Sequence, residues 1–365
     1  MSANWGKNIE LSIFGESHGK AIGINLGKLP AGLPIDMDLV EKEMQRRAPG
    51  NNALSTARKE KDQVEILSGI QNGITTGAPL CAIIYNSDQH SKDYSLLETH
   101  MRPGHSDYAA YMKYHGYNDV RGGGHFSGRI TAPIVFAGAV IKQILAQQHI
   151  YVGAHIKSIK NIEDENFDVE LNKDILDRLS TQLYPVLNAF VFKQMEEVVN
   201  NARKEGDSVG GKIECGVIGL PAGIGEPFFD SLESTIAHLM FSIPAVKGLE
   251  FGDGFNLCKA FGSESNDSYY YENDEVKTKT NHNGGIVGGI SNGMPITFTV
   301  GIKPTPSIAL KQETINVKTK ENTTLEIKGR HDPCIVFRAV AVVEAMCAIA
   351  IYEAMGGSYE NIRRM

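Results

Sequence analysis

Apolar and polar positions follow two different periods along this chain, and each period predicts one kind of element. Alternating or unbroken apolar runs bounded by turn residues predict strands. They lie at residues 9–13, 63–67, 79–85, 151–159, 212–220 and 295–302. Helical spacing of the apolar residues predicts helices at residues 36–47, 106–117, 131–148, 186–204, 232–241 and 339–351. Strands and helices alternate irregularly, which favours an α+β fold over a doubly wound parallel sheet.

Capping residues mark the ends of three predicted helices. The helix at 36–47 begins with acidic side chains and ends with basic ones, an order that suits the helix dipole. Thr131 is expected to be the N-cap of the helix that follows it, with Pro133 in the first turn. Asp332 is expected to cap the last helix in the same way, with Pro333 as its first residue.

The length of 365 residues allows one large domain or two medium domains. No repeat and no low-complexity linker divides the chain, so we predict a single catalytic domain over residues 1–365. Residues 162–182 are charged and irregular, and they are predicted to form a peripheral insertion.

The formal net charge of -7 argues against partners that need a basic field, such as nucleic acid or a membrane surface. The N-terminal residues lack the basic and apolar regions of a secretory signal. The five cysteines are widely spaced and include no C-x-x-C pair, which indicates a reducing compartment. These features predict a cytoplasmic protein. No metal site is predicted, since the histidines lack ligand spacing.

Glycine-rich loops carry the histidines and arginines that are candidates for chemistry. The loops are 14–19 with His18, 101–107 with Arg102 and His105, 121–129, 281–290, 303–307 and 328–333. Taken singly, each loop is also typical of a tight turn or a helix cap. Glycine lets the backbone approach a ligand, and arginines and helix N-termini bind anions. Together the loops therefore predict a site for a multiply anionic small molecule.

In their order along the chain, these loops resemble the signature blocks of the chorismate synthase family. The blocks are Phe-Gly-Glu-Ser-His-Gly at 14–19, Arg-Pro-Gly-His-Ser-Asp at 102–107, Arg-Gly-Gly-Gly at 121–124, Gly-Gly-Ile-Val-Gly-Gly at 284–289 and Gly-Arg-His-Asp-Pro-Cys at 329–334. The resemblance implies a lyase of the shikimate pathway to aromatic amino acids. Such an enzyme converts 5-enolpyruvylshikimate 3-phosphate to chorismate by 1,4-elimination of phosphate, with reduced FMN as cofactor. It also implies a homotetramer whose subunit is a β-α-β sandwich, with two antiparallel sheets enclosed by helices.

The active-site roles of the family carry over to the matching positions of this sequence. The resemblance implies that His18 protonates the departing phosphate, that His105 faces the flavin, and that Asp332 assists proton removal. The substrate-binding positions are His18, Arg47, Arg129 and Arg330. The cofactor-binding positions are His125, Phe126, Ser127, Pro244, Ala245, Gly288, Lys303, Pro304, Thr305, Pro306, Ser307 and Arg330.

Two departures from the family pattern bear on the cofactors. His125 and Phe126 stand where the family often has Arg and Ser. Ala53 stands where many members carry a basic residue associated with phosphate or NADPH binding. The resemblance makes Arg47 the candidate NADPH contact, and it leaves NADPH and an external flavin reductase as alternative sources of reduced FMN. Because no flavin-reductase domain is visible in the chain, the external source is favoured.

Two other functions fit the same glycine-rich loops. A different flavin-dependent or phosphate-handling lyase would keep the loops and change the substrate arginines. A noncatalytic anion-binding module would bind ligand without turnover and would tolerate the loss of both His18 and His105.

Overall fold

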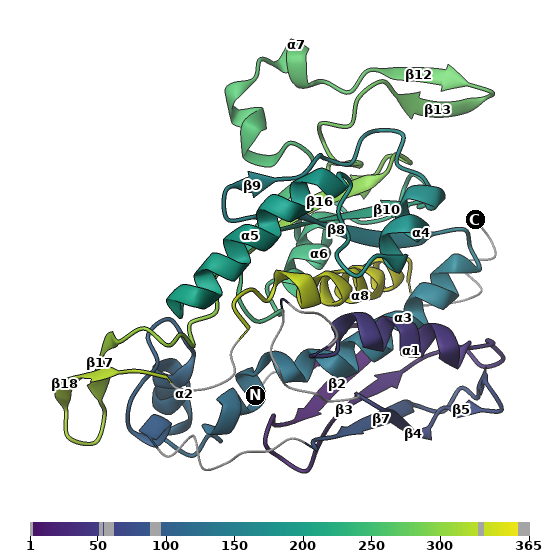
Figure 1. Cartoon of the computed structure of the whole chain (residues 1–365). Helices are drawn as coiled ribbons and strands as arrows, with labels where there is room; N and C mark the ends of the chain where they lie inside the picture. The colour runs from purple at the N-terminus through teal and green to yellow at the C-terminus, as the bar shows by residue number, and fades with distance from the viewer. Residues whose placement is uncertain (1–2, 51–53, 55–61, 88–95, 328–331, 357–365) are drawn as a thin grey trace.

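Two five-stranded antiparallel sheets hold a layer of helices between them in the computed structural model, which describes residues 3–50, 54, 62–87, 96–327 and 332–356 (Figure 1). The first sheet has the order β1 (Asn4–Trp5), β2 (Glu10–Gly15), β3 (Ala21–Gly27), β7 (Leu80–Tyr85) and β4 (Val64–Ser68). The second sheet has the order β11 (Val246–Phe251), β16 (Ile296–Ile302), β10 (Gly211–Ile218), β8 (Tyr151–Ile159) and β9 (Ile162–Glu163).

The helices and small hairpins complete the fold. The α-helices are α1 (Met37–Arg47), α2 (Asp107–Tyr114), α3 (Thr131–Ala146), α4 (Lys173–Thr181), α5 (Ala189–Glu205), α6 (Leu232–Met240), α7 (Gly262–Ser265) and α8 (Val336–Ala354). The 3-10 helices are η2 (Arg121–Phe126), η3 (Gly128–Ile130), η4 (Phe228–Asp230) and η5 (Gly254–Lys259). The hairpins are β5 (Ile70–Gln71) with β6 (Ile74–Thr75), β12 (Tyr269–Glu272) with β13 (Glu275–Thr278), β14 (Ile286–Val287) with β15 (Ile290–Ser291), and β17 (Gln312–Asn316) with β18 (Glu321–Leu325). The segment from α7 to β13 projects from the sandwich (Figure 1).

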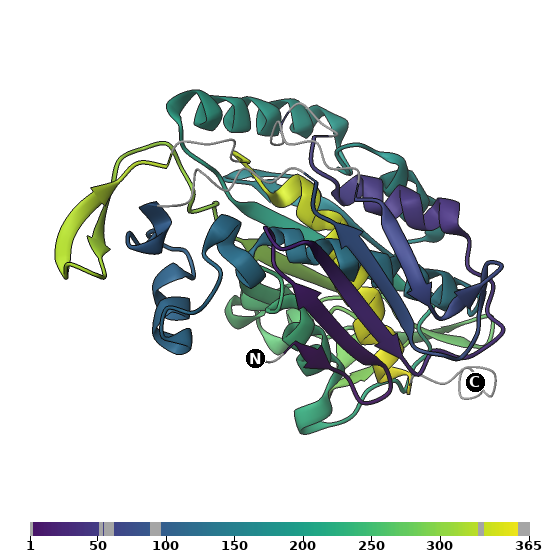
Figure 2. The same cartoon turned by 90° about the horizontal axis from the view of Figure 1, so that it is seen from below.

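Helices α3 and α8 form the centre of the sandwich. Both are buried along almost their whole length, and the two views show α8 between the sheets (Figures 1 and 2). The helices approach each other at Gly138, where an added Cβ atom would lie 2.2 Å from the Cβ of Ala345. The packing of the central layer therefore depends on a glycine at this position.

One helical stretch, Gly128–Ala146, has the length and apolar composition of a membrane span. Within the protein, 83% of that stretch is buried. Its apolar side chains are thus used in packing between the two sheets, as is usual for a core helix.

The predicted α+β class and the sandwich of two antiparallel sheets are confirmed. Residues 162–182 supply the edge strand β9 and helix α4, which packs on the outer face of the second sheet. An added Cβ at Gly153 in β8 would lie 2.9 Å from the side chain of Leu176 in α4, so the two elements are in close contact. The assignment of residues 1–365 to a single domain stays a prediction.

The two helices predicted to be capped by Thr131 and Asp332 begin differently from expectation. Thr131 is the first residue of α3 and not its N-cap, because η3 runs directly into the helix. Its hydroxyl donates a hydrogen bond to the carbonyl of Gly128 at 2.6 Å. Helix α8 begins only at Val336, and Asp332 instead accepts a hydrogen bond from the side chain of Arg338 at 2.7 Å. Both predicted caps are therefore wrong.

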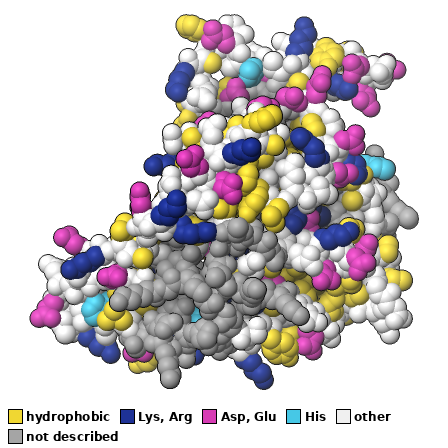
Figure 3. Space-filling view, in the orientation of Figure 1, with side chains coloured by type: hydrophobic (Ala, Val, Ile, Leu, Met, Phe, Trp, Pro, Cys, Tyr) yellow, Lys and Arg dark blue, Asp and Glu magenta, His cyan; other side chains and the backbone are white. Residues whose placement is uncertain are grey.

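Charged side chains of both signs are interspersed on the face of the molecule shown in Figure 3. Several of them form ion pairs at the surface, such as Lys212 with Glu163 at 3.0 Å. Exposed pairs of this kind contribute little to stability. The ion pairs that connect the helices of the central layer are buried in the sandwich.

A buried carboxylate, Glu344 of α8, joins three helices of the central layer to strand β8 of the second sheet. It accepts hydrogen bonds from Arg46 of α1 at 2.7 Å and from Lys142 of α3 at 2.8 Å. It also accepts the backbone N–H of Ala154 in β8 at 3.1 Å. Burial alone would raise the pKa of Glu344, but the two cations outweigh this effect and lower the pKa to about 2. Glu344 is therefore ionised throughout the neutral range.

A buried histidine, His155 of β8, fastens the outer layer to the second sheet. Its Nδ1 lies 3.1 Å from Asp164 and its Nε2 lies 2.8 Å from Glu214. Asp164 also accepts the backbone N–H groups of Leu187 and Asn188, which lie before α5. Burial alone would lower the pKa of His155, but the hydrogen bonds to both carboxylates outweigh it and raise the pKa above its ordinary value.

We expect His155 to make the stability of the protein depend on pH. Because its folded-state pKa is raised, its contribution is fully present below the unfolded-state pKa of about 6.5. The contribution is lost as the pH rises through the folded-state pKa. Urea unfolding of wild type and His155→Gln at a series of pH values should show the largest difference in unfolding free energy at acidic pH. The exposed His149, replaced by Asn, is the control. A His155→Gln difference that is constant across this pH range would contradict the prediction.

Candidate active site

A cavity of about 1060 Å³ lies among loops from both halves of the chain. Its wall combines the end of α1, helices η2 and η3, the loop before α2, residues 241–247, the 303–307 loop and the start of α8. The cavity brings together most of the residues predicted for the site, namely His18, Arg47, His105, His125, Phe126, Ser127, Arg129, Pro244, Ala245, Lys303, Thr305, Pro306, Ser307 and Asp332.

Three predicted site residues are not among the described lining residues of the cavity. Gly288 is absent from the described lining of the cavity. It lies in the β14–β15 turn, whose next residue, Gly289, accepts the backbone N–H of Leu232 at the start of α6. The cavity lies at the other end of that helix. Pro304 sits between two lining residues but is not part of the described lining itself. Arg330 lies outside the described residues, as does Ala53.

His18 lies in the turn that follows β2 and is buried against η2. An added Cβ at Gly122 would lie 2.3 Å from the imidazole, so the glycine makes this close approach possible. The Ser17 hydroxyl donates its one hydrogen to the carbonyl of Arg121 at 3.1 Å and therefore accepts from Nδ1 of His18 at 3.0 Å. In the neutral imidazole this hydrogen bond places the ring hydrogen on Nδ1.

Two buried arginines, Arg47 of α1 and Arg129 of η3, share one buried carboxylate at the cavity. Asp62 accepts a hydrogen bond from Arg47 at 2.7 Å and another from Arg129. Arg47 also donates to the carbonyl of Gly128 and to the hydroxyl of Thr131. Burial lowers the pKa of Arg47 to about 10, because nearby positive charges add to the effect and the attraction of Asp62 offsets it only in part.

His105 lies in the loop before α2 and contacts the carboxylate of Asp107. Nδ1 of His105 lies 2.6 Å from a carboxylate oxygen of Asp107. Arg102 binds the same carboxylate through two side-chain nitrogens, each at 2.7 Å. Burial alone would raise the pKa of Asp107, but the hydrogen bonds from Arg102 and His105 hold it well below its usual range. The carboxylate is therefore charged.

Asp332 faces the cavity from the segment before α8. Its carboxylate pairs with Arg338 at 2.7 Å, and Arg338 in turn donates to the backbone carbonyl of Arg47 at 3.0 Å. The pair thus links the start of α8 to the end of α1. It also places a carboxylate and a further cation next to the two buried arginines.

The cavity has an apolar side, formed by part of its lining, in addition to its charged side chains. Leu97, Leu325 and Ile327 form a small cluster on it, and the first turns of α8 extend the apolar surface. The 303–307 loop closes the cavity with Lys303, whose amine donates to the carbonyl of Gly104. Such a combination suits a flat ring with anionic groups at one end.

Ala245 adopts a positive φ of 73° at the edge of the cavity. A non-glycine residue rarely takes this conformation unless surrounding contacts impose it, and such strain clusters at functional sites. Here the carbonyl of Ala245 accepts the backbone N–H of Lys303 at 3.0 Å. The strained backbone thus joins two segments that the family resemblance predicts to bind the cofactor.

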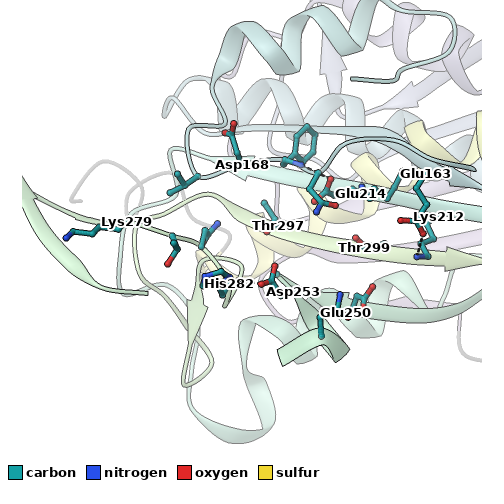
Figure 4. Close-up of a pocket in the computed structure, with 18 residues that line it drawn as sticks. Glu163, Asp168, Lys212, Glu214, Glu250, Asp253, Lys279, His282, Thr297 and Thr299 are labelled. Atoms are coloured by element: carbon teal, nitrogen blue, oxygen red, sulfur yellow. Dashed lines mark hydrogen bonds and ion pairs between the residues drawn. The ribbon is translucent and has the colours of Figure 1, made fainter. Parts of the chain in front are cut away.

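A second, smaller cavity of about 390 Å³ lies on the outer face of the second sheet (Figure 4). Some of its charged side chains pair with one another, as Figure 4 shows for Lys212 with Glu163 and for His282 with Asp253. None of the predicted site residues in the described part of the chain lines it. The larger cavity is therefore the candidate active site.

Sequence reasoning misses the charge partners of the site, which are Asp62, Asp107 and Arg338. For Asp107 a signal exists, because it follows His105 by two positions in the same motif. For Asp62 no local pattern points to Arg129, which is 67 residues away in the chain. Contacts of this kind become visible only in the folded protein.

Comparisons with known proteins agree on one family. A family model described as chorismate synthase matches residues 9–355. A chorismate synthase of Dehalococcoides mccartyi is 45% identical over 96% of both chains. One of Methanocaldococcus jannaschii is also 45% identical, over 96% of this chain and 95% of its own. A solved structure described as "Crystal Structure of Chorismate Synthase" has a TM-score of 0.77 at 27% identity and covers 99% of this chain and 96% of its own.

Proposed function

This chain belongs to the chorismate synthase family, and from that membership we propose how its cavity carries out the reaction. The activity is that of a phosphate-eliminating lyase that forms chorismate in the shikimate pathway. The observation that carries the residue assignments is the convergence of two histidines and two buried arginines on one cavity.

His18 is proposed as the acid that protonates the departing phosphate of 5-enolpyruvylshikimate 3-phosphate. Nδ1 of His18 is engaged by Ser17, so the transferred proton would come from Nε2 of the imidazolium form of His18. A general acid must lie within hydrogen-bond distance of the oxygen that it protonates, and the contact with Ser17 holds the imidazole of His18 in a fixed orientation. The small exposure of His18, 3%, supports the role because it keeps bulk water away from the imidazole.

Arg47 and Arg129 are proposed to bind the anionic groups of the substrate. A guanidinium carries five N–H groups, and Arg47 uses three of them on Asp62, Gly128 and Thr131. Its remaining donors allow a contact with a carboxylate or a phosphate. Asp62 holds both guanidinium groups and offsets part of their repulsion. Arg330 stays a proposed substrate ligand outside the described residues.

The apolar side of the cavity and the 303–307 loop are proposed to hold FMN. The family uses reduced FMN, and the residues fit it, since the apolar side suits the ring and Lys303 suits the phosphate. When bound, reduced FMN supplies electron density to the allylic system as phosphate leaves. His125, Phe126, Ser127, Pro244 and Ala245 are proposed contacts.

His105 is proposed to face this flavin, and Asp332 is proposed to assist removal of the substrate proton. The two residues line the same cavity from different segments. Asp332 is held by Arg338 at 2.7 Å, which fixes the direction of its carboxylate.

An anaerobic assay tests this assignment. Purified enzyme is mixed with 5-enolpyruvylshikimate 3-phosphate and photoreduced FMN, and chorismate is followed by its ultraviolet absorbance. We expect turnover with reduced FMN and none with oxidised FMN. Full turnover in air without flavin would overturn the cofactor assignment.

The reduced flavin is proposed to come from an external reductase. The competing contact with NADPH would rest on Arg47, whose side chain is only 2% exposed and already bonded to three protein groups. NADPH alone should therefore not sustain turnover of the purified enzyme. We also propose a homotetramer in the cytoplasm, in keeping with the family.

A further inference from the structure

His105 is held from behind by two charged residues to which the proposed reaction gives no role. Asp107 is the first residue of α2, and its carboxylate contacts Nδ1 of His105 at 2.6 Å. Arg102 binds that carboxylate through Nε and Nη2 and also through its backbone N–H at 3.1 Å. Arg102 and His105 lie in the loop that leads into α2, and Asp107 and Arg102 are almost fully buried.

The hydrogen-bond partners of His105 determine its tautomer. An ionised carboxylate only accepts hydrogen bonds, so Nδ1 of His105 must carry the hydrogen. The alternative partner, the Ser106 hydroxyl, lies 3.4 Å away and is a weaker contact. Nε2 is left to act toward the cavity. An added Cβ at Gly123 of η2 would lie 3.3 Å from this nitrogen, so η2 packs directly against it.

We propose that Asp107 is a positioning residue of this enzyme: it fixes the orientation and tautomer of His105, and Arg102 fixes Asp107. Arg102, Asp107 and His105 thus form a chain of hydrogen bonds that ends at the cavity. The inference rests on the proposed role of His105 toward the flavin. It adds Asp107, which acts through His105 and is absent from the described lining of the cavity, and Arg102, which fixes Asp107 and itself lines the cavity.

A purely structural role for Asp107 makes a different prediction. An acidic residue in the first turn of α2 interacts favourably with the helix dipole, and its pairing with Arg102 stabilises the loop. In that case the loss of Asp107 would weaken folding and would reduce activity independently of His105. A double-mutant cycle separates the two roles.

The experiment compares wild type, Asp107→Asn, His105→Ala and the double variant under anaerobic turnover. Asparagine can turn its amide N–H toward Nδ1 and so favour the opposite tautomer. We expect Asp107→Asn to lower kcat roughly 10- to 100-fold, a part of what a general acid or base contributes, with little change in KM. In the His105→Ala background the same substitution should have no further effect. Asp107→Glu, which keeps the carboxylate, should recover part of kcat.

Asp164→Asn is the matched control, because Asp164 is also a buried aspartate that contacts a histidine nitrogen, but far from the cavity. It should leave kcat unchanged.

Each failure has its own signature. If His105→Ala keeps wild-type kcat, the proposed role of His105 fails and the positioning role falls with it. If His105→Ala loses activity but Asp107→Asn does not, only the positioning role is overturned. It is equally overturned if the two losses multiply in the double variant.

Discussion

Replacement of His18 by alanine is expected to lower kcat by roughly 10²- to 10⁴-fold, the usual contribution of a general acid. The leaving phosphate would then depart without a proton from the protein. Substrate affinity should change less, because Arg47 and Arg129 supply the charge that binds the anionic groups. Steady-state kinetics under anaerobic conditions with reduced FMN measure both quantities.

His100→Ala is the matched control for this variant. His100 contacts the hydroxyl of the preceding Thr99 at 2.9 Å, much as His18 contacts that of Ser17 at 3.0 Å. It does not line the described cavity. Its replacement should leave kcat unchanged. A His18→Ala variant with wild-type kcat would remove His18 from the proposed mechanism.

The substitution Glu344→Gln is expected to destabilise the folded protein by roughly 3–5 kcal/mol, the usual cost of breaking a buried ion pair. It would leave the two cations Arg46 and Lys142 with Glu43 as their one remaining carboxylate in the described network. The neutral amide would also lose one acceptor, although the backbone N–H of Ala154 still needs a partner. Urea unfolding at neutral pH measures the difference.

Glu43→Gln serves as the control for the core network. Glu43 pairs with the same two cations, but its side chain is 17% exposed and contacts no backbone N–H in the described network. The loss should therefore be smaller. Because the folded-state pKa of Glu344 is about 2, its contribution is present above the unfolded-state pKa of about 4.3 and is lost as the pH falls through about 2. Equal destabilisation by the two substitutions would contradict this account.

The regular elements could be predicted from the chain where local periodicity and packing agree. The helix predicted at 36–47 is α1, and the Asp36 side chain caps it as its position suggests. The strand predicted at 151–159 coincides with β8. In both cases the pattern of apolar residues reports which side faces the core.

The predictions failed where a side chain had a stronger partner elsewhere. Asp332 carries the signature of an N-cap, but its carboxylate pairs with the Arg338 side chain in the first turn of α8, which begins only at Val336. Thr131 fails as a cap for a different reason. Helix η3 continues directly into α3, so Thr131 is the first residue of the helix and not the residue before it. Local propensity cannot weigh such competing contacts.

For the active site, the order of the glycine-rich loops was enough to indicate an anionic ligand and to reveal the resemblance to chorismate synthase. The resemblance also identified His18, His105 and Arg129 as candidates. A motif is defined by the order of residues along the chain, so it can be recognised from the sequence without a structure. The fold was needed to show that these loops surround one cavity and that Gly288 is not part of its described lining.

The glycine-rich loops alone did not reveal the charge balance of the site. Asp62 neutralises Arg47 and Arg129, and Asp107 orients His105, because folding buries these groups together. Burial makes each unpaired charge costly, so the partners are set by distance and desolvation and not by spacing along the chain. The chain therefore specifies which chemistry is available, and the packing of its loops specifies the protonation and direction of each group.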